Sequence, residues 1–147
     1  MAQDEDEAAR WLRKAADRGH AAGQNNLGRM YRHGRGVAED DSEAVRWLRK
    51  AADERHAAAP FNLGVRYQEG RGVAKDEPEA VWWFRKAADQ GHIAAQVNLG
   101  EMYRHGLGVA KDEAEAVRWF RKAADQGDAR GQQLLTKPSF WRRLFGG

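Results

Sequence analysis

The chain has 147 residues, a formal net charge of +3 and no cysteine. Its length suffices for one domain with a buried core, and the missing cysteines exclude a disulfide framework or a thiolate metal site. The start is too acidic for a signal peptide, and no apolar run approaches the roughly 20 residues of a membrane span. We therefore expect a cytoplasmic protein, although a signal peptide removed beforehand would leave no trace.

The first helix is predicted over about residues 5–18. Asp4 stands at its N-cap position, where a carboxylate accepts hydrogen bonds from first-turn N–H groups, and Glu7 three residues later completes a capping box. Gly19 follows the last turn, as glycine commonly does where helices end. Trp11 lies in the middle of this helix and begins the pattern that organises the rest of the chain.

The remaining sequence repeats with a period of 36 residues. Complete repeats occupy residues 20–55, 56–91 and 92–127. The most regular position holds a tryptophan, at Trp11, Trp47, Trp83 and Trp119, and we expect all four rings to be packed between helices. A fixed period between 20 and 50 residues is typical of stacked arrays, in which each unit buries its apolar face against its neighbours.

Each repeat is predicted to form two helices, called here the first-type and the second-type helix. In residues 92–127, Ala95, Leu99 and Tyr103 share one face of the first-type helix, because they are four residues apart. Gly106 then ends this helix and begins a short glycine-rich connector over 106–111. The structure predicted for each unit is therefore a helical hairpin.

The second-type helix of this repeat begins at Asp112, with Glu115 as the second half of a capping box. The same acidic pair recurs at the start of every second-type helix. One side of the helix is predicted to be buried, comprising Ala116, Trp119, Phe120, Ala123 and Ala124. Gly100 and the alanines allow the two helix axes to approach closely, and Gly127 ends the unit.

The array ends with a truncated first-type helix over 128–136, followed by a tail over 137–147 that breaks the repeat. We therefore divide the chain into an all-α repeat array, residues 1–136 with a partial unit at 4–19, and the tail. Two residues depart from the pattern. Pro60 falls in a first helical turn, where its missing N–H costs little. Arg55 replaces a terminating glycine, and a positive φ there would cost about 1 kcal/mol.

The combined pattern resembles the Sel-like repeat, the 36-residue relative of the tetratricopeptide repeat. It comprises Asn-Leu-Gly-x-x-Tyr, Gly-x-Gly-Val-x-x-Asp and Ala-Val-x-Trp-Phe-Arg-Lys-Ala-Ala-Asp-Gln-Gly, and the match covers about residues 4–135. The resemblance implies an α/α solenoid of right-handed superhelical form that acts as an adaptor or scaffold for protein partners. Some bacterial relatives carry a cysteine pair in each repeat, which this chain lacks.

The sequence offers little for catalysis, and we expect no enzymatic activity, cofactor or metal. The hydroxyl nucleophile candidates other than tyrosine, Ser42, Thr136 and Ser139, have no histidine in a suitable local arrangement, and a cysteine nucleophile is absent. One histidine recurs in each unit, at His20, His56 and His92. These would lie on the order of 10 Å apart, too far to share a zinc ion whose ligands sit at about 2 Å.

Four basic pairs form a ladder along the second-type helices. They are Arg13-Lys14, Arg49-Lys50, Arg85-Lys86 and Arg121-Lys122. Such a ladder could bind phosphates, which makes nucleic-acid binding the alternative function. The pairs nevertheless lie in the later halves of their helices, where the helix dipole favours cations. Nucleic acid is therefore not the partner that we expect.

The candidate binding residues lie on the first-type helices, which line the inner surface in the family that the chain resembles. A helical wheel places one asparagine per unit, Asn26, Asn62 or Asn98, away from the core side. The side chains aligned with it vary, as specificity positions would: Arg29, Met30 and His33; Arg66 and Glu69; Glu101, Met102 and His105. An asparagine matches the donor and acceptor of a peptide amide. The competing interpretation is that it joins neighbouring helices.

The leading hypothesis is a non-enzymatic interaction module that binds a peptide segment of a partner in a concave groove. The alternatives are nucleic-acid binding and a purely structural spacer. The tail is predicted to cap the last unit or to dock on another molecule, which includes a second copy of the chain. Its apolar side chains are Phe140, Trp141, Leu144 and Phe145.

Overall fold

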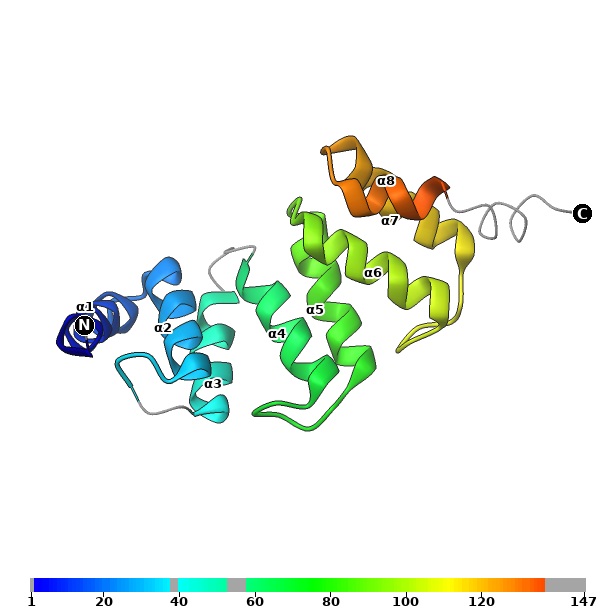
Figure 1. Ribbon diagram of the computed structural model, residues 1–147. Helices are drawn as coiled ribbons and strands as arrows, with labels where there is room; N and C mark the ends of the chain where they lie inside the picture. Colours follow the sequence, from blue (N-terminus) through cyan, green and yellow to red (C-terminus); the bar gives the residue numbers. More distant parts are fainter. Residues whose placement is uncertain (1, 38–39, 53–57, 137–147) are drawn as a thin grey trace, which may run out of the picture. The chain divides into compact units, whose positions relative to one another are not determined.

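The computed structural model describes residues 2–37, 40–52 and 58–136 and contains only α-helices as regular secondary structure in those ranges (Figure 1). They form two compact units of four helices each. The first unit contains α1 (Ala2–Asp17), α2 (Ala21–His33), α3 (Asp41–Ala52) and α4 (Ala58–Glu69). The second contains α5 (Glu77–Asp89), α6 (Ile93–His105), α7 (Glu113–Asp125) and α8 (Ala129–Thr136).

Within each unit, every helix packs against the next helix in the sequence. In the first unit α2 lies against α1 and α3, and α3 also lies against α4; in the second unit α6 and α7 are likewise packed between their sequence neighbours (Figure 1). Alternate helices are of the first type (α2, α4, α6, α8) and the second type (α1, α3, α5, α7). The structure therefore contains the predicted succession of helices.

The tryptophans of the full repeats lie in the core, as predicted. Trp47, Trp83 and Trp119 are 3%, 8% and 6% exposed. Gly100 of α6 lies against the Phe120 ring of α7, where an added Cβ would be 2.4 Å from Phe120 Cε1. This contact confirms the close approach expected of the small residues.

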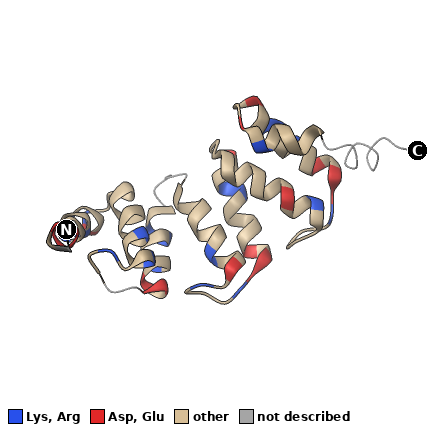
Figure 2. Cartoon of the chain, in the orientation of Figure 1, with Lys and Arg blue, Asp and Glu red and all other residues tan. Residues whose placement is uncertain are grey.

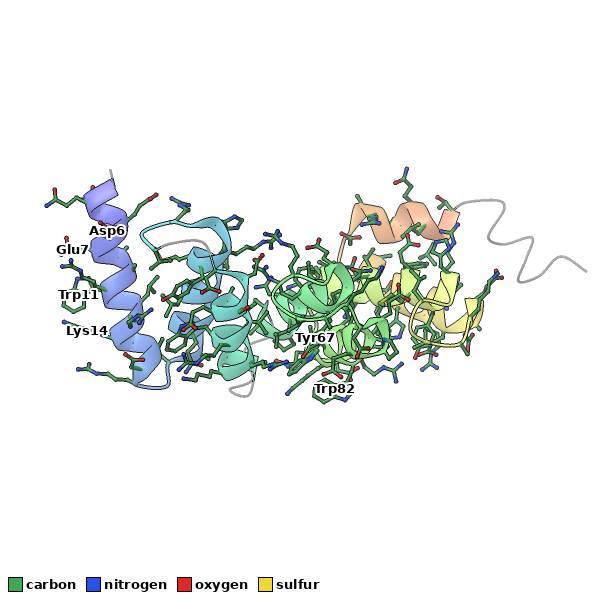
Figure 3. The ribbon with its side chains drawn as sticks, turned by 90° about the horizontal axis from the view of Figure 1, so that it is seen from below. Asp6, Glu7, Trp11, Lys14, Tyr67 and Trp82 are labelled. Carbon is green, nitrogen blue, oxygen red and sulfur yellow. The ribbon has the colours of Figure 1, made fainter. Side chains whose placement is uncertain are left out.

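The prediction that all four repeat tryptophans are packed is wrong for Trp11, which is 63% exposed. Trp47, at the matching position of α3, packs with Leu27 of α2 and Ala16 of α1. Trp11 occupies the corresponding side of α1, and no described helix covers that side (Figure 3). Trp47 is thus buried by the first-type helix α2 that precedes it in the sequence.

The indole N–H groups of the buried tryptophans differ in their partners. Trp83 Nε1 donates to Glu79 Oε1 at 3.1 Å, whereas Nε1 of Trp47 and Trp119 is buried without a hydrogen-bond partner among the described residues. The matching glutamates of those two units instead pair with arginines one turn on, at 3.2 Å for Glu43–Arg46 and 3.1 Å for Glu115–Arg118. In α5 the arginine position holds Trp82, which is 54% exposed and packs edge-on against Trp83.

The predicted N-caps are confirmed at Asp40 and Asp112. Their carboxylates accept from the N–H groups of Glu43 and Glu115, each at 3.0 Å. The reciprocal half of the capping box is wrong, because the N–H of each aspartate donates to a tyrosine carbonyl of the preceding helix instead. Asp4 is not an N-cap either, since α1 already begins at Ala2.

The second glycine of each connector has a role beyond ending a helix. Gly108 has φ +70°, and a Cβ added to it would lie 2.5 Å from the carbonyl of Glu77, the first residue of α5. Gly36 and Gly72 make the same approach to Glu5 in α1 and Asp41 in α3. The connector therefore packs onto the start of the second-type helix one unit earlier, which a side chain would prevent.

Several predicted features lie outside the described residues. They are Arg55 and the tail side chains Phe140, Trp141, Leu144 and Phe145. Pro60 falls in the first turn of α4, as expected, and is fully buried. None of the described helices combines the length and apolar character needed to cross a membrane.

Candidate peptide-binding surface

A hollow of about 320 Å³ lies between α1 and α2 in the first unit. It brings together four of the predicted binding residues, Asn26, Arg29, Met30 and His33. Asn26, Arg29 and His33 are exposed, and Met30 is half-buried. The lining is completed from α1 and the connector after α2, by Asp4, Glu5, Ala8, Leu12 and Arg35.

The lining combines an apolar part with charges of both signs. Ala8 and Leu12 of α1 supply the apolar part, together with Met30. Glu5 Oε1 accepts from Arg35 Nη2 at 2.9 Å, so this acid already has a partner inside the hollow. Such exposed pairs contribute little stability, typically below about 1 kcal/mol, and open readily when a ligand offers an equivalent contact.

Asn62 serves a structural role in the first unit. Its Nδ2 donates to Oδ1 of Asn25 at 3.1 Å, and Asn25 is 5% exposed. This bond joins α4 to α2, so the tie between helices that the sequence left open is present at Asn62. Asn25 was not predicted from the sequence to have a role. The sequence did contain an indication of its role, because Asn25 is polar whereas the equivalent positions of the other repeats hold Phe61 and Val97.

Arg66 does not lie on the candidate surface, and its prediction as a binding residue is corrected. It is 2% exposed and pairs with Asp41 at the start of α3, which also accepts from Arg71 at 3.3 Å. Burial disfavours the charged carboxylate, but the hydrogen bonds and charges of both arginines outweigh it and hold the pKa of Asp41 below its ordinary value. Arg66 therefore connects α4 to α3. Glu69 remains exposed at the end of α4.

In the second unit, Glu101 and His105 lie together on α6. Glu101 is half-buried, and its carboxylate is 3.2 Å from His105 Nε2 and 3.8 Å from Arg130 Nη2 of α8. Asn98, one turn earlier, is half-buried. The second unit thus presents an acid surrounded by basic side chains, whereas the first presents Arg29 beside apolar residues.

The prediction of Met102 as a binding residue is also corrected, because its side chain is 1% exposed and part of the core. Met102, Met30 and Arg66 occupy the same position in their repeats. In α4 this position faces the preceding second-type helix, as the Arg66–Asp41 pair shows. The wheel angle alone placed it with the exposed residues.

The basic ladder lies against aromatic rings. Figure 2 shows the charged residues along the helices; among the acidic ones, Glu113 and Glu115 lie in the first turn of α7. The guanidinium groups of Arg13, Arg49 and Arg85 lie 5.5–5.9 Å from the ring centroids of Tyr31, Tyr67 and Tyr103, each on the next helix. Lys14, Lys50, Lys86 and Lys122 lie over tryptophan rings. The arginines thus connect successive helices through cation–π contacts.

The comparisons identify the family. The family model for the Sel1 repeat matches residues 1–20, 21–56, 57–92 and 93–128. The chain belongs to the Sel1 repeat family. The resemblance predicted from the sequence and the all-α repeat fold that it implies are confirmed. Sel1 repeats typically mediate protein–protein interaction. Among the curated proteins, none matches the chain.

Solved Sel1 repeat structures superpose well on this chain. A protective antigen of uropathogenic Escherichia coli with an SLR fold is 39% identical, with a TM-score of 0.90 over 96% of this chain and 30% of its own. A Sel1 repeat protein from Oxalobacter formigenes is 40% identical, with a TM-score of 0.84 over 88% and 54%. This chain therefore spans about a third and about half of their lengths.

A more distant structure shares only the fold. Helicobacter pylori cysteine rich protein B is 24% identical, with a TM-score of 0.73 over 92% of this chain and 97% of its own. The Sel1 repeats of this chain contain no cysteine.

Proposed function

We propose that this Sel1 repeat chain is a non-enzymatic scaffold that binds an extended segment of a protein partner on its first-type helices. The observation that supports this most directly is the hollow of about 320 Å³ beside α2. It joins an exposed asparagine, Asn26, to an apolar part formed by Ala8 and Leu12. Ligand sites generally combine an apolar lining with a few polar groups that fix orientation.

Each part of the hollow has a chemical role in this proposal. The Asn26 amide donates to and accepts from the main chain of the segment. One apolar side chain of the segment packs on Leu12 and on Met30, whose flexible thioether adapts to different shapes. Arg29 and His33 then favour an acidic residue beside that side chain. The volume suits one or two side chains of a peptide rather than a folded domain.

The second unit offers a different chemistry on the equivalent helix. Glu101 lies among His105, Arg104 and Arg130, so an incoming basic side chain would compete with these groups for the carboxylate. Asn98 supplies a second amide for the main chain of a partner. The two units thus differ in the side chains that they select, although they share the asparagine.

The alternative of nucleic-acid binding finds less support. The arginines of the basic ladder that lie over tyrosines are engaged in helix packing. A complex held by phosphate contacts would weaken by about 10³–10⁵ in affinity between 50 and 200 mM salt, given 6–10 contacts. Peptide binding through amides and apolar contacts changes far less over the same range.

The experiment is partner capture from an extract of the source organism, quantified by mass spectrometry. The test variant is Asn26→Ala/Arg29→Ala. Its control is Ser42→Ala/Arg46→Ala, which changes two exposed residues of α3 in the same unit. We expect the test variant to lose a partner that the control retains, with retention unchanged after nuclease treatment. Equal capture by both variants, or loss on nuclease treatment, would refute the proposal.

A further inference from the structure

The exposed side of α1 carries a stripe of five side chains, of which Asp4 also borders the hollow between α1 and α2. Asp4, Glu7, Trp11, Lys14 and Arg18 are spaced by three or four residues, so they follow one face of the helix and the turn after it. All five are exposed. Figure 3 shows Glu7, Trp11 and Lys14 on the side of α1 that faces away from α2.

This stripe contains Trp11, the more exposed of the two large apolar side chains that the described residues expose. Trp11 is 63% exposed, and Lys14 Nζ lies 4.8 Å from its ring centroid. A second hollow, of about 300 Å³, lies beside the ring and is lined by Glu7 and Arg10 among others. In α3, the matching Trp47 is covered by Leu27 of a neighbouring helix. The equivalent surface of α1 around Trp11 could therefore pack against a helix in the same way.

The charges of the stripe are arranged symmetrically around Trp11. Two acids, Asp4 and Glu7, precede it by seven and four residues, and two bases, Lys14 and Arg18, follow it by three and seven. An antiparallel copy of the same helix, with the two-fold axis at Trp11, would place Asp4 opposite Arg18 and Glu7 opposite Lys14. A parallel copy would place like charges together, which is unfavourable.

We propose that this face of α1 is a self-association surface, on which α1 of a second copy packs antiparallel across a two-fold axis at Trp11. The two tryptophan rings meet at the axis, and four ion pairs flank them. Such isologous two-fold pairing is the commonest symmetry of homo-oligomers. A contact made by one helix from each copy is small, so we expect a weak dimer, with a dissociation constant on the order of micromolar.

The test is sedimentation velocity of the full chain over about 1–300 μM, a range that brackets this expectation. Trp11→Glu should remain monomeric throughout, while its control, Trp82→Glu at the other exposed tryptophan, should dimerise like the unchanged chain. Association that survives in Trp11→Glu, or a monomeric unchanged chain at every concentration, would overturn the proposal.

Charge exchange tests the antiparallel arrangement and does not depend on the stability of Trp11→Glu. Glu7→Lys and Lys14→Glu should each raise the dissociation constant about tenfold, because each makes two opposed pairs repulsive. The double variant restores opposite charges in both pairs and should recover the original constant. Failure of the double variant to recover it would overturn the pairing, as would association that depends on residues 139–147 rather than on α1.

Discussion

The clearest energetic prediction concerns the tryptophans of the second unit. Trp83→Phe and Trp119→Phe remove the same part of an indole ring from equivalent, buried positions, so the two variants lose similar packing. The two rings differ in their N–H groups. Trp83 Nε1 donates to Glu79 at 3.1 Å, whereas Trp119 Nε1 is buried without a partner among the described residues.

The magnitude follows from this difference. Trp83→Phe loses a hydrogen bond to a carboxylate, worth at most about 1.5–3 kcal/mol and less here because Glu79 is half-exposed. Trp119→Phe removes an unpaired buried donor, whose burial costs about 1–3 kcal/mol. We therefore expect Trp83→Phe to lower the free energy of unfolding by about 2 kcal/mol more than Trp119→Phe.

Urea unfolding followed by circular dichroism at 222 nm measures both changes, provided that the dependence on urea concentration stays the same. A further variant tests the cause. Trp82→Arg places an arginine at the position from which Arg46 and Arg118 pair with Glu43 and Glu115. This arginine should pair with Glu79 in place of Trp83 Nε1, so in the Trp82→Arg background the two Phe variants should differ less in the free energy of unfolding. Equal costs for the two Phe variants, or a larger cost for Trp119→Phe, would refute this explanation.

Three further predictions concern stability. Trp47→Ala should cost about 3–5 kcal/mol and Trp11→Ala less than about 1 kcal/mol at low protein concentration, because only the first ring is buried; urea unfolding measures both. Asp41→Asn should destabilise the protein at pH 7. Because the pKa of Asp41 is lowered in the folded state, its charged form stabilises the unchanged chain above pH 3.8, and this stabilisation is lost as the pH falls further. Urea unfolding of the unchanged chain and of Asp41→Asn at several pH values measures this loss. Burial lowers the pKa of His92, whose Nδ1 accepts from the Ala95 N–H. The unfolded chain therefore binds a proton at this residue more readily, and the free energy of unfolding should decline as the pH falls below 6.5. His92→Asn should reduce that decline in the same measurement.

Much of the fold follows from the spacing of residues along the chain. Apolar residues with helical spacing identify the helices, and Asp112 and Gly106 mark where one begins and another ends. These are local interactions within one or two turns, which a single sequence states directly. The same local signals predicted a short helix over 128–136, and α8 is found at Ala129–Thr136.

The candidate site was less predictable, because it depends on which neighbours each helix meets. Met30, Arg66 and Met102 share one repeat position, yet Met30 lines a hollow, Arg66 pairs with Asp41, and Met102 is core. Their wheel angle is the same, and only the adjacent second-type helix decides their burial. The exposure of Trp11 also depends on neighbouring helices, because Trp11 and Trp47 occupy the same repeat position and only Trp47 is covered.

The most direct test of the proposed function is site-specific photo-crosslinking to the captured partner. A photoreactive amino acid placed at Arg29 lies in the hollow of the first unit, and the same group at Arg46 lies on an exposed side of α3. We predict a cross-link from position 29 to one short segment of the partner and none from position 46. Cross-links from position 46 alone, or equally from both positions, would contradict binding on the first-type helices.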